Sequence, residues 1–177
     1  MKAILKLNHW QIFLLIYGIP LLALLLPSSR TTTFPFNALC AIAYIYVMIA
    51  QISYPIIIGK ALHKRLPSTI TLSNKLIPLF FSCFCVLIVI MSISTWIEPQ
   101  LLRDYPPVFM LMILLSLIFI FFVARFAAKV IASTELKRAA KPIEYLGYLI
   151  GLWLIFMGVW FVQPKIRNLI TQGDVAP

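Results

Sequence analysis

The stretch PVFMLMILLSLIFIFFVARFAAKVIASTELKRAAK, residues 107–141, decides the fold class of this chain. Its first half, residues 107–124, contains no Asp, Glu, Lys, Arg or His. A helix needs ~20 apolar residues to cross the hydrocarbon core of a bilayer, with a range of about 17–25. These 18 residues therefore predict a transmembrane helix that leads directly into a charged segment.

Four more apolar runs without charge or His lie on either side of this stretch, over residues 10–26, 36–58, 76–97 and 145–162. The chain is 62% hydrophobic and 11% charged, with a mean hydropathy of +1.00, whereas soluble domains are roughly 45–50% apolar and about 25% charged. We therefore predict an all-α, polytopic membrane protein. Its five transmembrane helices would form one bundle in a single membrane domain that covers residues 1–177.

The Lys and Arg residues are divided unequally between the two sides of this predicted bundle. Eleven of the fifteen fall before the first run or in the second and fourth connections, and four fall on the other side. Short cytoplasmic loops retain Lys and Arg, so the N-terminus is expected in the cytoplasm and the C-terminus outside it. The net charge of +10 is then explained by the Lys and Arg residues that fix the orientation of the helices in the membrane. It does not indicate nucleic-acid binding, because no basic region remains that could fold by itself.

The charged segment after residue 124 is expected to continue the fourth helix beyond the membrane. Helix-forming residues run without a breaker as far as Pro142, so the extension should end near residue 141. Its cations overlap its large apolar residues around the helix, which favours a projecting basic stalk over a helix lying flat on the bilayer. Together with cations of the second connection, it would contact a partner or the anionic phospholipid headgroups of the inner face, or it would be a solvated helix end that only fixes the topology. The residues concerned are Arg125, Lys129, Lys137, Arg138, Lys141, Lys60, Lys64 and Arg65.

The fifth run contains three glycines on one side of a helix. At 100° per residue, Gly147, Gly151 and Gly158 form a narrow stripe, and the first two have the spacing that lets helix backbones approach closely. The stripe predicts a helix-packing interface. The partner helix could belong to this chain, to another membrane protein or to a second copy.

Within the apolar runs, the residue types that usually bind metals or cofactors or act in transport do not indicate such a site. Cys40, Cys83 and Cys85 read as buried thiols, and the positions of His9 and His63 do not indicate a haem, so no metal or cofactor is expected. Ion-coupled transport usually leaves ionisable residues within the bilayer, and the runs contain none.

Two further features stay open. Pro20 could act as a hinge or as an ordinary packing kink, and Glu98, Arg103 and Asp104 could act on a lipid headgroup or form a solvated turn.

Residues 128–169 end in WFVQPKIRN, residues 160–168. This part of the chain resembles the C-terminal portion of small, uncharacterised multi-pass inner-membrane proteins of Bacteroidota. The resemblance implies a bacterial inner membrane and supplies no catalytic residue.

The sequence therefore favours a membrane protein that is not an enzyme. The first hypothesis is an integral membrane subunit or scaffold that associates with another membrane protein, or with itself, through helix packing and the basic extension. One alternative is a small transporter or oligomeric pore. Another is a membrane enzyme that modifies lipid headgroups.

Overall fold

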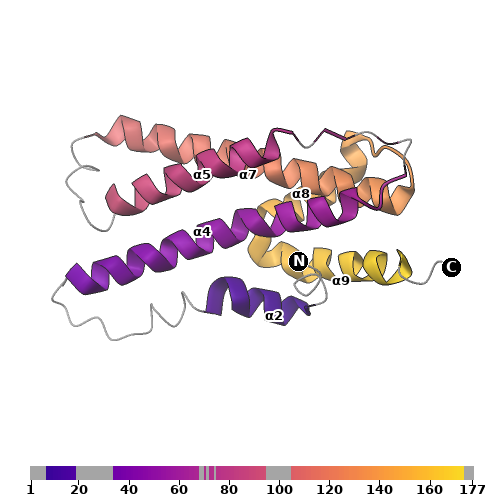
Figure 1. Ribbon diagram of the computed structural model, residues 1–177, viewed down its shortest axis with the longest axis horizontal. Coiled ribbons are helices and arrows are strands. Elements are labelled where there is room, and N and C mark those ends of the chain that lie inside the picture. The colour runs from indigo at the N-terminus through magenta and orange to yellow at the C-terminus, as the bar shows by residue number, and fades with distance from the viewer. Residues whose placement is uncertain are drawn as a thin grey trace.

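The structure is a computed structural model that describes residues 7–18, 34–67, 70, 72–73, 75–94 and 105–173. Within those ranges every regular element is helical (Figure 1). The helices are α2 (His9–Phe13), η1 (Leu14–Gly18), α4 (Phe34–His63), α5 (Ile77–Ser92), α7 (Pro106–Leu136), α8 (Pro142–Trp153) and α9 (Ile155–Gly173). The all-α prediction is confirmed for this part of the chain.

Two long apolar helices, α4 and α7, run side by side with the shorter apolar helix α5 (Figure 1). Large apolar side chains remain exposed along them, among them Val86 and Ile90 on α5 and Met110 and Leu114 on α7. Residues 39–63 of α4 and all of α7 are long and apolar enough to cross a membrane, and α5 is a shorter apolar helix. The molecule thus has an apolar half whose hydrophobic surface faces outward.

The main hydrophobic core lies at the other end of the molecule, where α4, α7, α8 and α9 meet. The alanine-rich part of α7 forms its centre, because Ala124, Ala127, Ala128 and Ala132 are all buried. Alanine side chains are small enough to let the neighbouring helices pack closely on α7. The prediction of a projecting basic stalk is therefore wrong: this segment of α7 is enclosed by other helices.

The predicted extension of the same helix to residue 141 is also too long. Helix α7 ends at Leu136, and Lys137 adopts a left-handed conformation, with φ 51° and ψ 23°. Such a residue commonly ends a helix because it turns the chain away from the helix axis. The buried hydroxyl of Ser133 accepts a hydrogen bond from the backbone N–H of Ala140 at 3.1 Å, which holds the following loop against the end of α7.

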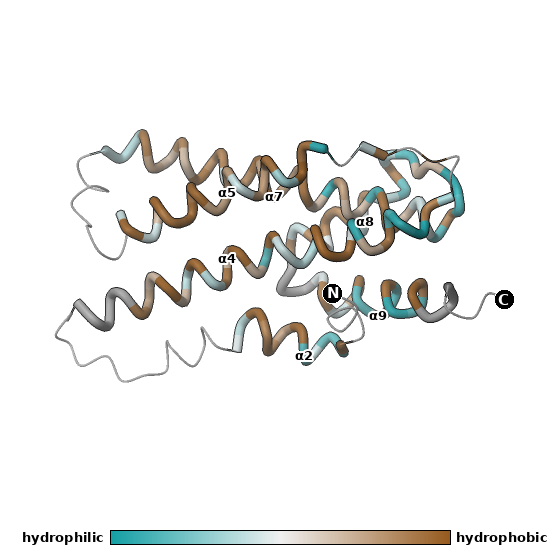
Figure 2. The backbone as a smooth tube through the Cα atoms, viewed as in Figure 1, coloured by the Kyte–Doolittle hydropathy of each residue, from teal (hydrophilic) through white to brown (hydrophobic). Residues whose placement is uncertain are grey.

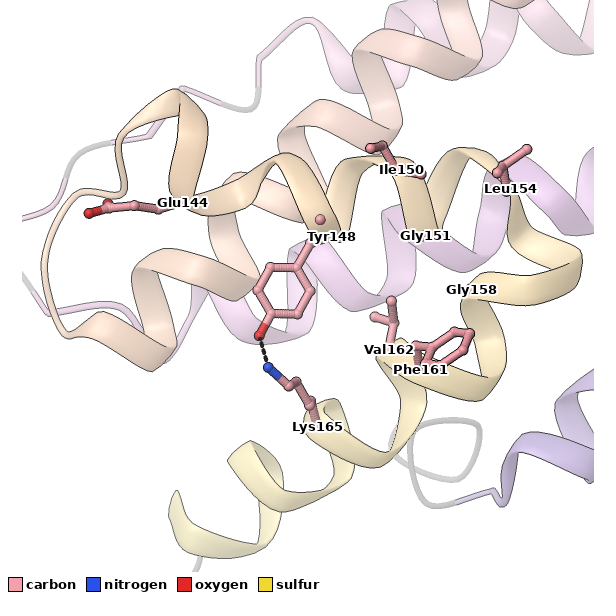
Figure 3. A pocket seen from close by; sticks show the side chains of 10 residues that line it. Glu144, Tyr148, Ile150, Gly151, Leu154, Gly158, Phe161, Val162 and Lys165 are labelled. Atoms are coloured by element: carbon pink, nitrogen blue, oxygen red, sulfur yellow. Dashed lines mark hydrogen bonds between the residues drawn. The ribbon is translucent and has the colours of Figure 1, made fainter.

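The predicted fifth transmembrane helix, residues 145–162, is wrong as a single helix. Leu154 leaves the helical conformation, with φ −91° and ψ 57°, and separates α8 from α9. The two helices fold back on each other as a hairpin (Figures 1 and 3). A run of eighteen apolar residues is long enough for a span, but length alone does not distinguish a straight helix from a hairpin.

The hairpin brings the end of α9 back to the beginning of the chain. Arg65, just beyond α4, donates a hydrogen bond to the carbonyl of Ile170 at 2.7 Å, and Arg167 donates to the side chain of Asn8 at 2.8 Å. The sequence placed the two termini on opposite sides. In the structure, the C-terminal half of α9 lies beside Asn8 and Arg65, and the side of the membrane on which each terminus lies stays a prediction.

The first and third predicted spans are described only in part. Helix α2 continues as the π-helix η1 to Gly18, and a short π-helical turn follows α5 as far as Ser94. Tyr46 on α4 donates a hydrogen bond to the carbonyl of Leu15, so the π-helical segment is fastened to α4. Pro20, Glu98, Arg103 and Asp104 lie outside the described residues, and so do the hypotheses based on them.

Candidate functional site

Charge is concentrated at one end of the molecule, where the described residues include eleven Lys or Arg and only two carboxylates, Glu135 and Glu144. The polar colouring of Figure 2 gathers at that end, beyond the apolar parts of α4, α5 and α7. Both carboxylates are already paired with cations of the chain. This end of the described structure is therefore strongly positive.

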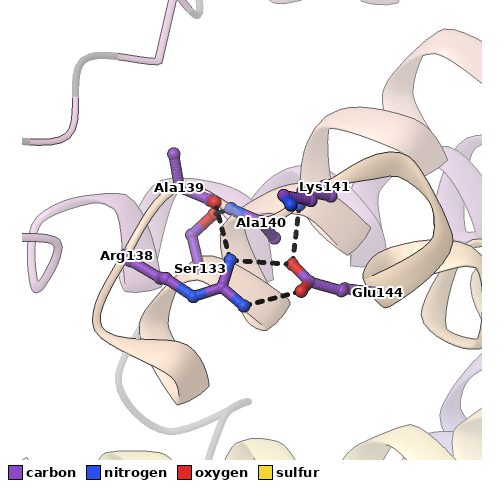
Figure 4. Close-up of polar contacts among 6 residues, drawn as sticks. All are labelled: Ser133, Arg138, Ala139, Ala140, Lys141 and Glu144. Atoms are coloured by element: carbon purple, nitrogen blue, oxygen red, sulfur yellow. Dashed lines mark hydrogen bonds and ion pairs between the residues drawn. The ribbon is translucent and has the colours of Figure 1, made fainter.

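Glu144 fastens the loop between α7 and α8 (Figure 4). Arg138 donates to both of its carboxylate oxygens, from Nη2 at 2.6 Å and from Nη1 at 3.1 Å. The backbone N–H of Lys141 donates to the same carboxylate at 2.7 Å, which caps the start of α8. These bonds favour the charged form, so Arg138 above all lowers the pKa of Glu144 from its usual value.

A groove of about 400 Å³ lies between α8 and α9 (Figure 3). Gly147 and Gly151 contribute to its α8 side together with Ile150. Its α9 side includes Val162 and Phe161, and the Phe161 side chain is 73% exposed. The groove is thus mainly apolar and opens at the surface.

Three polar side chains from three helices meet at one end of this groove. Lys165 on α9 donates a hydrogen bond to the hydroxyl of Tyr148 on α8 at 2.9 Å, as Figure 3 shows. Tyr148 in turn donates to Glu135 of α7, and Lys165 Nζ lies 3.7 Å from the other oxygen of that carboxylate. The bond to Tyr148 and the charge of Glu135 both raise the pKa of Lys165, so this lysine stays cationic near neutral pH. The groove therefore has an apolar body and one charged end.

The three predicted interface glycines have different surroundings. A Cβ added to Gly158 would lie 1.5 Å from the carbonyl oxygen of Gly151, so these two glycines allow α8 and α9 to cross. A Cβ added to Gly147 would meet nothing within 4 Å. Of the predicted stripe, Gly151 and Gly158 face each other within the chain, and Gly147 faces the open groove.

The predicted basic residues do not form one surface. Arg138 and Lys141 belong to the loop fastened by Glu144, and Lys137 ends α7. Arg65 is bound to the end of α9. Lys60 and Lys64 lie at the end of α4 and in the following turn, whereas Arg125 and Lys129 line a separate cavity beside α5.

Gln163 is a structural centre that sequence reasoning missed. It is only 2% exposed, and its side-chain oxygen accepts a hydrogen bond from Tyr54 of α4 at 2.8 Å. Its amide nitrogen donates to the carbonyl of Leu7 at 3.0 Å. The signal was present as the first polar residue of WFVQPKIRN, directly after an apolar run, but nothing in the sequence indicated its partners.

The described residues contain no group of three or more His, Cys, Asp or Glu side chains that could hold a metal ion. Cys40, Cys83 and Cys85 are free thiols. His9 packs against Trp160 with ring centroids 4.5 Å apart, and a ring nitrogen of His63 lies 2.8 Å from the carbonyl of Leu72. Both histidines thus hold neighbouring segments together.

Comparison of the chain with protein-family models, with curated proteins and with solved structures finds no match. The resemblance of residues 128–169 to Bacteroidota inner-membrane proteins stays a prediction. In the part of the chain that the structure describes, the architecture is helical and includes two helices long and apolar enough to span a membrane.

Proposed function

We propose that the chain is an integral protein of a bacterial inner membrane, with its basic end in the cytoplasm. The observation that supports this is the separation of an outward-facing apolar surface on α5 and α7 from the eleven cations at one end. Monomeric soluble proteins rarely expose apolar patches of this extent. Cations on the cytoplasmic side agree with the positive-inside rule.

The arrangement of the helices favours four crossings, in place of five. The crossing segments would be the first apolar run, which begins near α2, and helices α4, α5 and α7. The α8–α9 hairpin would lie at the cytoplasmic face, because Arg65 and Asn8 hold α9 there. This topology places thirteen of the fifteen cations inside and leaves Arg30 and Arg103 outside, a stronger asymmetry than five crossings give.

We assign the protein the role of a non-catalytic membrane subunit or scaffold that receives an amphipathic helix of a partner protein in the hairpin groove, at the cytoplasmic face. Gly147 leaves the groove open, and Ile150 and Phe161 offer apolar walls. The small Gly147 lets a second helix approach the groove closely, and the apolar walls would bury the apolar face of that helix. The basic extension has no part in this partner contact, because the alanine-rich face of α7 is covered by the neighbouring helices.

Co-purification in a mild detergent tests this role. Gly147→Leu would place a side chain in the groove at a position where an added Cβ meets nothing within 4 Å, so a bound partner should be lost while the protein remains folded. Leu146→Phe is a matched control, because it enlarges an exposed neighbour on α8 that does not line the groove. A partner that is retained by the control and lost from Gly147→Leu supports the role. The same partners on both variants would contradict it.

A further inference from the structure

A second cavity, separate from the hairpin groove, lies between α7 and the segment that leads into α5. Its volume is about 290 Å³. Phe122 and Phe126 line it from α7, and Leu76 and Phe80 line it from the other side. The rings of Phe80 and Phe122 lie 5.4 Å apart between centroids, so the two helices meet through aromatic side chains at this cavity.

Two cations of α7 line the same cavity. Arg125 and Lys129 are four residues apart, so they lie one above the other on a single face of the helix. Tyr145 of α8 holds Arg125 in place, since Arg125 Nε donates to its hydroxyl at 3.4 Å. Neither cation has an ion-pair partner among the described residues. Glu135 is paired with Lys165, and Glu144 is paired with Arg138.

The cavity lies at the boundary between the two halves of the molecule. The apolar surface of α7 continues up to Phe121 and Phe122, both of which are about 40% exposed, and the cations begin three residues later. A ligand here would meet an aromatic, apolar wall on the membrane side and two positive charges on the cytoplasmic side. Only an amphipathic anion matches both parts of this surface.

We infer that this cavity binds one anionic phospholipid of the inner leaflet, with its phosphate held by Arg125 and Lys129 and one acyl chain lying against Phe80 and Phe122. The inference rests on the membrane orientation proposed above and goes beyond it, since it assigns a specific lipid site. A planar guanidinium beside an ammonium group provides several donors to the phosphate oxygens. The aromatic walls exclude water from the chain that leaves the headgroup.

Native mass spectrometry of the full-length protein in neutral detergent tests the site, with phosphatidylglycerol as the probe and zwitterionic phosphatidylcholine as the reference. We expect Lys129→Gln and Arg125→Gln each to weaken phosphatidylglycerol binding about fivefold, since a cation near an anionic lipid surface contributes ~1 kcal/mol. Lys64→Gln removes the same charge from the same end but outside the cavity, and it should leave binding unchanged. Phe122→Ala should weaken the binding of phosphatidylglycerol and leave any binding of soluble glycerol phosphate unaltered.

Three outcomes would overturn the inference. An equal loss in Lys64→Gln would show diffuse attraction to the basic end, and unchanged binding in both cavity variants would show that the lipid binds elsewhere. Glycerol phosphate that competes as well as phosphatidylglycerol would show a site for free phosphate. If Arg125→Gln unfolds because its contact with Tyr145 is lost, the result for Lys129→Gln alone decides whether the cavity binds the lipid. Resistance of the wild-type protein to alkaline extraction from membranes tests the membrane proposal separately.

Discussion

Gly158 lies directly against the backbone of Gly151, so close that a Cβ on Gly158 would be 1.5 Å from the carbonyl oxygen of Gly151. This contact joins α8 to α9 where the chain reverses. Because the obstacle is backbone, no side chain can rotate away to make room. The hairpin, and with it the groove, depends on the absence of a side chain at this position.

The glycines should therefore respond very differently to alanine. Gly158→Ala should destabilise the protein by more than about 3 kcal/mol or rearrange the hairpin, because it overpacks against backbone. Gly147→Ala should be neutral or stabilising by up to about 1 kcal/mol, since alanine favours a helix and the space is open. Thermal unfolding in detergent measures both. Equal melting temperatures for the two variants would contradict the hairpin crossing.

An intermediate effect is expected at Gly59 on α4. An added Cβ there would lie 2.7 Å from the ring of Phe126, a side chain that is able to shift. Gly59→Ala should cost about 1–2 kcal/mol, between the effects at Gly158 and Gly147. It should also disturb the lipid cavity, which Phe126 lines, so phosphatidylglycerol binding and melting temperature should fall together. A normal lipid affinity in a destabilised variant would show that the ring shifts away from the cavity.

The buried bond between Tyr54 and Gln163 should contribute measurably to stability. Tyr54→Phe removes the hydroxyl that donates to Gln163, at a site where both residues are less than 5% exposed. The expected loss is about 1–2 kcal/mol, as for other buried hydrogen bonds. Gln163→Leu should cost more, because the bond to Leu7 is lost as well. In a double-mutant cycle the two losses should be less than additive, and full additivity would show that the bond contributes nothing.

The sequence was sufficient for the class of fold and for most helix positions, because long apolar runs and alanine-rich segments favour helices strongly. The starts of α4, α5 and α7 lie close to the predicted ones. The burial of most of residues 124–133 could not be read from the helix angles alone. Around the helix, the cations overlap the large apolar side chains, so no apolar face stands out. The contact surface is formed by small side chains, among them Ala124, Ala127 and Ala128.

The sequence identified individual residues of the site, but it did not predict how they are arranged. The glycines were identified, but their angles were calculated on a straight helix, and the break at Leu154 puts Gly151 and Gly158 on different helices. A hairpin becomes visible only when a residue such as Gln163 is known to reach α4 and the N-terminal segment. Those contacts join residues 109 and 156 positions apart, which no local pattern records.

The loop between α7 and α8 should weaken in acid. Arg138 lowers the pKa of Glu144, so the carboxylate stabilises the folded protein above its unfolded value of 4.5, and this contribution disappears as the pH falls through the lower folded value. The melting temperature of Glu144→Gln should therefore be below that of the wild type at neutral pH, and the difference should vanish in acid. The pair lies at the surface, with Arg138 exposed and Glu144 partly exposed, so the difference should be small and should shrink in high salt. Arg138→Gln is the matched variant; a constant difference at all pH values would contradict the role of the ion pair.

The position of α9 distinguishes four membrane crossings from five. Arg65 holds the carbonyls of Leu169 and Ile170 at the end of α4, so a reporter fused after Gly173 should lie on the same side as the turn that contains Arg65. With the basic end in the cytoplasm, green fluorescent protein at this position should fluoresce and alkaline phosphatase should be inactive. The same reporters placed after His63 provide the reference for the cytoplasmic side. An active phosphatase after Gly173 together with a fluorescent fusion after His63 would restore the straight fifth span and contradict the hairpin.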